Sequence, residues 1–197
     1  MDSPRQPAVT TWHPGVVLPP EALTPEIIEA IKAALSPAQT VGLTIWAEAR
    51  ARFVPGTGWV PNPLDAAADV ANVIDNRALD RRWRKLGHKG VCLQRWAFSC
   101  WEPKGGPDDP HDADHLAENF EALMERAQQL LAGLTPSPRL TACIDVAQSF
   151  IDGKHPNMLG LTVCHYIADW LTPWPAWALG HNPKIARHGH LFFAGIA

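Results

Sequence analysis

Apolar and polar positions along the chain predict a mostly helical protein. Apolar residues recur at helical spacing in five segments, which are residues 24–35, 37–53, 63–83, 115–131 and 138–151. Two of these segments begin with a hydroxyl residue followed by proline, Thr24-Pro25 and Ser36-Pro37, a typical helix start. The last segment ends before Gly153, a residue that commonly terminates helices.

The remaining segments favour loops and a small β element. Residues 54–63, VPGTGWVPNP, are dense in proline and glycine and predict a loop. Residues 84–110 are mostly irregular, with a short apolar piece near 91–96. Near the C-terminus, residues 161–168 and 188–197 are short, apolar and strand-like, and a Trp- and Pro-rich loop separates them. We therefore expect an α+β protein, predominantly helical, with a small antiparallel β element near its C-terminus.

The chain shows no internal repeat, and its patterning predicts two parts. Residues 1–23 are rich in proline and lack periodicity, so they predict an extended N-terminal arm. Residues 24–197 then form a single domain, and with 46% hydrophobic residues in the chain they can bury a core.

Charge and composition exclude several classes of partner. The 17 basic and 20 acidic residues leave a net charge of −3, which gives no reason to expect nucleic-acid binding. No apolar run reaches the length of a membrane span, so stable membrane insertion is not expected. The first residues lack the basic and apolar regions of a secretory signal, which predicts synthesis in the cytoplasm without a signal peptide. The four cysteines form no CxxC pair, and we expect free, mostly buried thiols.

One carboxylate stands out on a helix that otherwise has an apolar stripe. Val41, Ile45 and Glu48 lie at i, i+4 and i+7 in the segment 37–53, so Glu48 shares the apolar face. A carboxyl group in apolar surroundings has a raised pKa, as a general acid near neutral pH requires. The alternative is an ordinary surface ion pair with Arg52 at i+4.

A set of five motifs gives this carboxylate a context. In order, LTIWAEAR, AADVANVIDNRAL, AFSCW, CHYIADWLTPWPAWA and IARHGHLFF span residues 43–193. This ordered set resembles cell wall hydrolases of the spore-cortex-lytic-enzyme type. The resemblance departs after the first motif, where family members usually continue with Gly-Glu. Here Ala51-Arg52 follow, and then the longer loop 54–63.

The resemblance implies a lysozyme-like fold and cleavage of the bond between N-acetylmuramic acid and N-acetylglucosamine. It places the family's catalytic acid on Glu48. Many members are thought to be lytic transglycosylases, in which the 6-hydroxyl of the sugar attacks C1 and leaves a 1,6-anhydro end. A muramidase is the other form of this expectation. A wall hydrolase without a signal peptide also fits a bacteriophage endolysin that reaches the wall after release or with the help of lysis partners.

Several other residues are candidates for contact with the glycan strand. Tyr166 rather than its neighbour His165 is expected to face the cleft, because strand residues alternate. Asp169 is a possible second carboxylate, and aromatic side chains suit the apolar faces of sugar rings. The substrate-binding candidates are Ser99, Trp101, Tyr166, Asp169, Trp170 and Trp177. Arg77 of the Asn-Arg pair is interpreted as a structural anchor.

Two alternatives remain open from the sequence. His188 and His190, with His165 and His181, raise the idea of a metal-dependent amidase or peptidase. No HExxH spacing occurs, and the leading hypothesis requires neither a metal nor a cofactor. The second alternative is a non-catalytic wall-binding virion module that uses the surface formed by some of the nine tryptophans.

Overall fold

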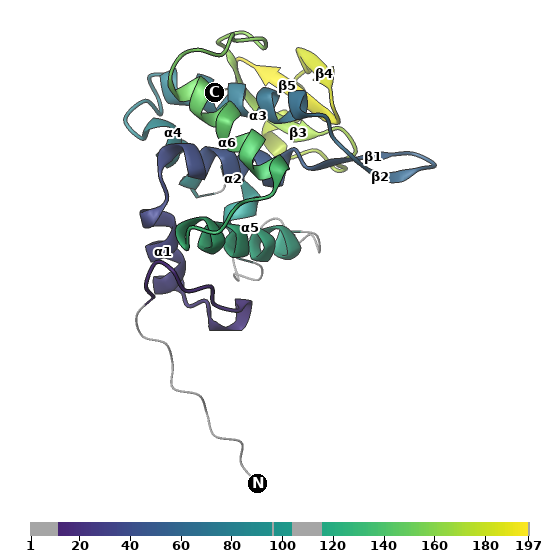
Figure 1. Cartoon of the computed structure of the whole chain (residues 1–197). Helices are drawn as coiled ribbons and strands as arrows, with labels where there is room; N and C mark the ends of the chain where they lie inside the picture. The colour runs from purple at the N-terminus through teal and green to yellow at the C-terminus, as the bar shows by residue number, and fades with distance from the viewer. Residues whose placement is uncertain (1–11, 96, 104–115, 197) are drawn as a thin grey trace.

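The computed structural model describes residues 12–95, 97–103 and 116–196 (Figure 1). Its α-helices in the described part are α1 Pro25–Ala34, α2 Pro37–Glu48, α3 Leu64–Leu79, α4 Gly87–Leu93, α5 Leu116–Leu131 and α6 Pro138–Ile151. Its strands are β1 Ala51–Val54, β2 Gly58–Pro61, β3 Val163–Ala168, β4 Ile185–Arg187 and β5 His190–Ala194. Three short 3-10 helices complete it: η1 Pro20–Ala22, η2 Ser99–Trp101 and η3 Ala176–Ala178. The expected α+β class with a small C-terminal antiparallel sheet is confirmed.

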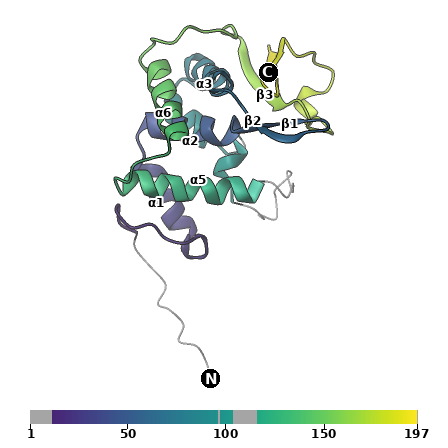
Figure 2. The same ribbon diagram turned by 45° about the vertical axis from the view of Figure 1, so that its right-hand side comes forward.

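Helix α2 is the central element of the helical part. It contacts α3, α4, α5 and α6, and all its residues from Thr40 to Ala47 are buried. Its start is fixed by a capping box between Ser36 and Gln39, as the Ser-Pro signal predicted. Figure 2 shows the helices grouped together, with the C-terminal sheet beyond the end of α2.

The segment after α2 differs from its prediction. The helix ends at Glu48, because Ala49 leaves helical geometry at φ −107° and ψ 21°, and β1 follows. Residues 51–54 pair antiparallel with residues 58–61, so the expected helix to Phe53 and the expected loop 54–63 form a hairpin instead (Figure 1). Glu48 and Arg52 therefore do not form the i, i+4 helical pair of the alternative interpretation.

The C-terminal sheet has the strand order β3-β5-β4, with antiparallel pairs throughout. A two-residue turn joins β4 to β5, and both its residues have positive φ, 53° at His188 and 79° at Gly189. His188 therefore lies in a turn, and His188 and His190 do not share a strand face as an i, i+2 pair. A Cβ on Gly189 would lie 2.6 Å from the Cβ of Arg52, so this turn approaches β1 closely.

The described part of the predicted N-terminal arm packs against the domain. Trp12 belongs to the main core, and its indole N–H donates to the carbonyl of Val16. The peptide group of Leu18 is held by Gln128 of α5, which accepts from its N–H at 2.8 Å and donates to its carbonyl at 3.2 Å. Residues 1–11 of the predicted arm lie outside the described residues.

Other sequence expectations have clear outcomes. The helices expected over 24–35, 115–131 and 138–151 are confirmed, and α4 was not predicted, because its segment GHKGVCL lacks helical periodicity. All four cysteines are buried and free. Within the described residues, no helix has the length and hydropathy needed to cross a bilayer.

The contact between α2 and α6 generates a stability prediction. A Cβ on Gly42 would lie 2.6 Å from Cγ1 and 2.8 Å from Cα of Ile144. Alanine improves helix propensity by roughly 1 kcal/mol, but overpacking against backbone typically costs about 1–3 kcal/mol. Contacts this short with a backbone atom belong to the upper part of that range, so after the gain in propensity we expect Gly42→Ala to lower the free energy of unfolding by about 1–2 kcal/mol in urea titrations.

The control for this variant is Asp145→Ala, which alters an exposed neighbour of Ile144 on α6. It is expected to change the free energy of unfolding by less than about 0.5 kcal/mol. A Gly42→Ala protein as stable as the wild type would show that the two helices separate without cost.

Candidate active site

The carboxyl group of Glu48 lies at the C-terminal end of α2, half-buried between the helices and the C-terminal sheet. The phenol of Tyr166, from β3, donates a hydrogen bond to its Oε2 at 2.8 Å. The backbone N–H and the thiol of Cys100, from η2, also bond to this carboxyl group. Three separate segments of the chain therefore meet at one carboxyl group.

Burial dominates the electrostatics of this group. Burial raises the pKa of Glu48, and the hydrogen bonds from Tyr166 and Cys100 and the nearby Arg77 charge oppose this increase without cancelling it. The pKa values of the Tyr166 phenol and the Cys100 thiol are likewise raised, by burial first and by the neighbouring carboxylate second. Both therefore stay protonated as donors, and Glu48 retains its own proton at a higher pH than an exposed glutamate.

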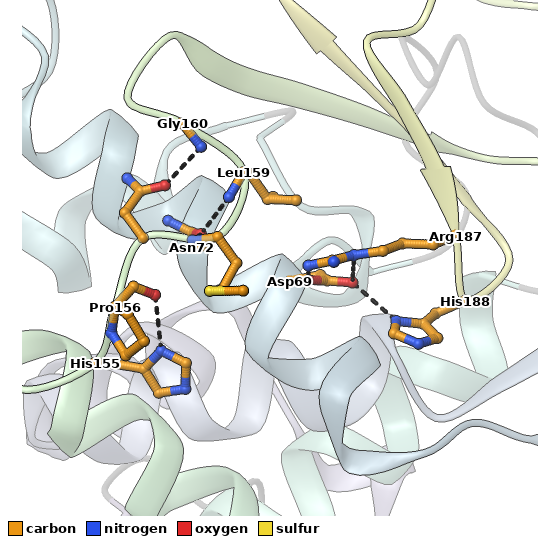
Figure 3. Close-up of polar contacts among 10 residues, drawn as sticks. Asp69, Asn72, His155, Pro156, Leu159, Gly160, Arg187 and His188 are labelled. Atoms are coloured by element: carbon orange, nitrogen blue, oxygen red, sulfur yellow. Dashed lines mark hydrogen bonds and ion pairs between the residues drawn. The ribbon is translucent and has the colours of Figure 1, made fainter.

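Helix α3 holds the β3 side of the site through buried amide side chains. Asn72 accepts from the backbone N–H groups of Met158 and Leu159 at 2.8 and 3.1 Å, as the Asn72–Leu159 contact in Figure 3 shows. Asn76 donates to the carbonyls of Gly160 and Val163 at 3.0 and 2.8 Å. Both amides are almost fully buried. They fix the loop that leads into β3.

Two further side chains, Arg77 and Asn157, complete this attachment. The Nε of Arg77 donates to the carbonyl of Cys164 at 2.6 Å, two residues before Tyr166. Asn157 donates to the side-chain oxygen of Asn76 at 2.6 Å, and it accepts from the N–H of Gly160 at 2.7 Å. The geometry agrees with the interpretation of Arg77 as a structural anchor.

The same helix binds the other edge of the sheet through Asp69. This carboxylate is 2% exposed and pairs with the Arg187 guanidinium, whose Nε lies 2.8 Å from Oδ2. The Nδ1 of His188 lies 2.9 Å from the same oxygen (Figure 3). The β4–β5 turn is thus tied to α3 by a charge-assisted pair and a second hydrogen bond.

His190 lies between this turn and Glu48. It is 5% exposed, and its ring lies edge-on to that of Tyr166 with 5.2 Å between centroids. Burial lowers the pKa of His190, while Asp169, Asp69 and the carbonyls of Glu48 and His188 act in the opposite direction. A neutral imidazole therefore packs against Tyr166, on the sheet side of Glu48.

Trp101 has a different position from the one its motif suggested. It is 1% exposed, and its indole N–H donates to the Thr44 hydroxyl at 2.8 Å. A ring enclosed in the core offers no face to a sugar, so this position gives no support to the expected stacking role of Trp101. Ser99 begins η2 directly before Cys100 and is half-buried.

The candidates after β3 lie at the surface. Asp169 is exposed, and its backbone N–H donates to the carbonyl of Gly189 at 2.9 Å. The half-buried ring of Trp170 meets Trp59 of β2 edge-on at 5.3 Å. Trp177 is half-buried against Phe193, so one of its faces serves the core of the sheet.

Some residues at the site were missed by the sequence analysis. Asp69 shares a helix face with Asn72 and Asn76, but its partners Arg187 and His188 are more than 100 residues away in the sequence. Cys100 gave no signal as a donor, because its role depends on the backbone turn of η2. Polar residues on one face of an otherwise apolar helix are the sequence signal that could have indicated the contacts of Asp69.

The histidines do not assemble a metal site in the part of the chain that the structure describes. No group of three or more His, Cys, Asp or Glu side chains there has the geometry to hold an ion. His165 packs between Trp83 and Trp177, away from His188. The metal-dependent amidase therefore gains no support from these residues.

Comparison with known proteins identifies the family. The family model of cell wall hydrolases matches residues 62–194, which is more than half of the chain and extends from the start of α3 to the end of β5. Glu48 lies before the matched range. No curated protein and no solved structure matches the chain. The match over α3 and the C-terminal sheet shows that the chain belongs to the cell wall hydrolase family, enzymes that act on peptidoglycan.

Proposed function

We propose that this enzyme cleaves the glycan strand of peptidoglycan, between N-acetylmuramic acid and N-acetylglucosamine, with Glu48 as the catalytic acid. The observation that carries the proposal is the half-buried Glu48 carboxyl group, with its raised pKa and its hydrogen bond from Tyr166. A general acid must hold its proton until substrate arrives, and burial gives Glu48 this property.

The arrangement around Glu48 supports a single-carboxyl mechanism. Tyr166 donates to Oε2, so in the proposed mechanism we assign the proton of the acid to Oε1, from which it passes to the glycosidic oxygen. When that proton moves to the leaving group, the carboxylate that remains is stabilised by Tyr166 and by the Cys100 N–H. It can then take the proton of the sugar's 6-hydroxyl as this oxygen attacks C1. One residue thus serves first as acid and then as base, which gives a 1,6-anhydro product.

Hydrolysis by a muramidase is the competing form of the same proposal. An inverting enzyme needs a second carboxylate about 6.5–9.5 Å from the acid to activate water. Asp169 is the candidate that the sequence offers, and its backbone is fixed to the β4–β5 turn beside His190. The hydrogen bonds from Tyr166 and Cys100 stabilise ionised Glu48, the form that acts as the base in the anhydro route, so we favour that route.

The first prediction concerns Glu48→Gln. The amide cannot donate an acidic proton, so we expect lysis of purified cell walls to fall at least about 1,000-fold, near the upper part of the range for general acid catalysis. Turbidity loss of wall suspensions measures the rate. Full activity in this variant would refute the role of Glu48.

The folding control for this variant uses the same pKa shift. Because burial raises the pKa of Glu48, the wild-type carboxyl favours folding at acid pH and loses this contribution as pH rises through the folded-state pKa. We therefore expect Glu48→Gln to be at least as stable as wild type at neutral pH and to lose this advantage at low pH. Urea titrations at the two pH values distinguish lost catalysis from unfolding.

The second prediction concerns the pH profile of Tyr166→Phe. Tyr166 stabilises the ionised form of Glu48, so removal of its hydroxyl is expected to raise the pKa of Glu48 further. The alkaline limb of kcat/KM against pH then moves to higher pH, and the maximum rate falls. An alkaline limb that stays in place, or moves to lower pH, would show that Tyr166 does not act on this acid.

The third prediction concerns the products. Mass spectrometry of digested walls should find fragments lighter than reducing muropeptides by the mass of one water molecule, because the anhydro ring forms with no water added. Reducing ends in place of anhydro ends would assign hydrolysis. Free peptide stems with intact strands would instead assign an amidase.

A further inference from the structure

A hollow of about 420 Å³ lies at the base of the β1–β2 hairpin. Its lining includes Arg50, Trp59, Asn62 and Arg139, which come from the hairpin, its flanking residues and α6. Glu48 does not line it, but Arg50 follows Glu48 by only two residues. Two residues of extended chain span at most about 7 Å, so the hollow is adjacent to the candidate active site.

Asn62 is the unusual residue of this hollow. It is 3% exposed, and neither Nδ2 nor Oδ1 of its side chain has a hydrogen-bond partner among the described residues. Its backbone is satisfied, since its N–H donates to the carbonyl of Arg50 at 3.1 Å and its carbonyl accepts from Arg139 at 2.9 Å. A buried amide with both groups unpaired destabilises a fold, so such a residue suggests a bound partner that offers one donor and one acceptor.

Two positive charges accompany this amide. Arg139 donates to the carbonyls of Ala49, Asn62 and Pro63, and Arg50 donates to the side chain of Asn119 at 3.2 Å. These acceptors are neutral, and no ion pair of either arginine occurs among the described side chains. The lining of the hollow is mostly apolar, and the two guanidinium groups beside it have neutral partners only, so a carboxylate at its rim would complement their charge.

Trp59 adds an apolar surface at the same place. Its ring is 57% exposed and is held edge-on by Phe53 at 5.8 Å and by Trp170 at 5.3 Å. These contacts position the indole and leave a face free. The hollow thus combines an amide, two guanidinium groups and an aromatic ring.

We propose that this hollow binds the peptide stem that hangs from the glycan strand, so that the enzyme selects strands carrying peptide. The proposal rests on the proposed function, and it adds a second recognition element beside the acid. A peptide bond supplies the N–H and C=O that Asn62 lacks, and the acidic residue and terminal carboxylates of the stem suit Arg50 and Arg139. Contact with the enclosed amide requires a small side-chain rearrangement in the wall of the hollow.

Other wall polymers match these groups less well. An N-acetylglucosamine oligomer offers amides but no carboxylate, so the two arginines would stay uncompensated. A phosphate-rich polymer would satisfy the arginines and leave the Asn62 amide without a partner. A peptide stem satisfies both sets.

The test is a calorimetric titration of the full chain with the free tripeptide L-alanyl-D-isoglutamyl-diaminopimelate. We expect wild type to bind it, Asn62→Leu to bind at least 10-fold more weakly, and Arg50→Gln to bind several-fold more weakly. Arg84→Gln, an exposed arginine beyond α3, is the matched control and should bind as wild type does. Asn62→Leu removes an unpaired buried amide, so its melting temperature is expected to rise or stay unchanged, which separates lost binding from unfolding.

A second measurement compares intact walls with strands stripped of their peptides. Wild type should cleave intact strands faster, and Asn62→Leu should cleave both at similar rates. If wild type does not bind the tripeptide but lyses walls in a Glu48-dependent way, the peptide site is refuted and the proposed function stands. Equal binding of an N-acetylglucosamine oligomer, weakened by Asn62→Leu, would also refute it. Tripeptide binding that depends on Asn62, in a protein that cleaves no glycan, would keep the peptide site and refute the proposed function.

Discussion

The attachment of the C-terminal sheet to α3 is the interaction on which the rest of the site depends. Asp69, Asn72 and Asn76 are buried polar residues on one face of this helix, and their bonds reach the loop before β3 and the β4–β5 turn. Buried polar groups require partners of defined geometry, so this face specifies one position of the sheet. An apolar face would have left the sheet free to shift against α3.

That position determines the chemistry at Glu48. Tyr166 reaches the carboxyl group because Arg77 holds β3 two residues earlier, and His190 packs on the far side of the phenol. Burial raises the pKa of Glu48, and the surrounding donors keep the ionised form accessible. The fold thereby produces a carboxyl group that can both give up and regain a proton.

Much of the fold was predictable where local signals act. Ser36-Pro37 indicated the start of α2, and the spacing of Asp69, Asn72 and Asn76 places these buried polar residues on one face of α3. The end of α2 was not predictable, because AEARARF favours helix and only pairing with residues 58–61 makes residues 51–54 a strand. The burial of Trp101 was not predictable for the same reason, because its contact with Thr44 joins residues 57 positions apart, which no local pattern reveals.

The β1–β2 hairpin follows from this non-local pairing and explains where the chain departs from the related motif. The resemblance leads to the expectation of Gly-Glu after Arg50, whereas here Ala51-Arg52 begin a strand that brings Trp59 and Asn62 back beside the end of α2. The hairpin thus places an exposed ring and an unpaired amide near the end of α2 without altering α2 itself. A hairpin at a helix end can change recognition while the Glu48 carboxyl group keeps its own support, because Tyr166 and Cys100 belong to other segments.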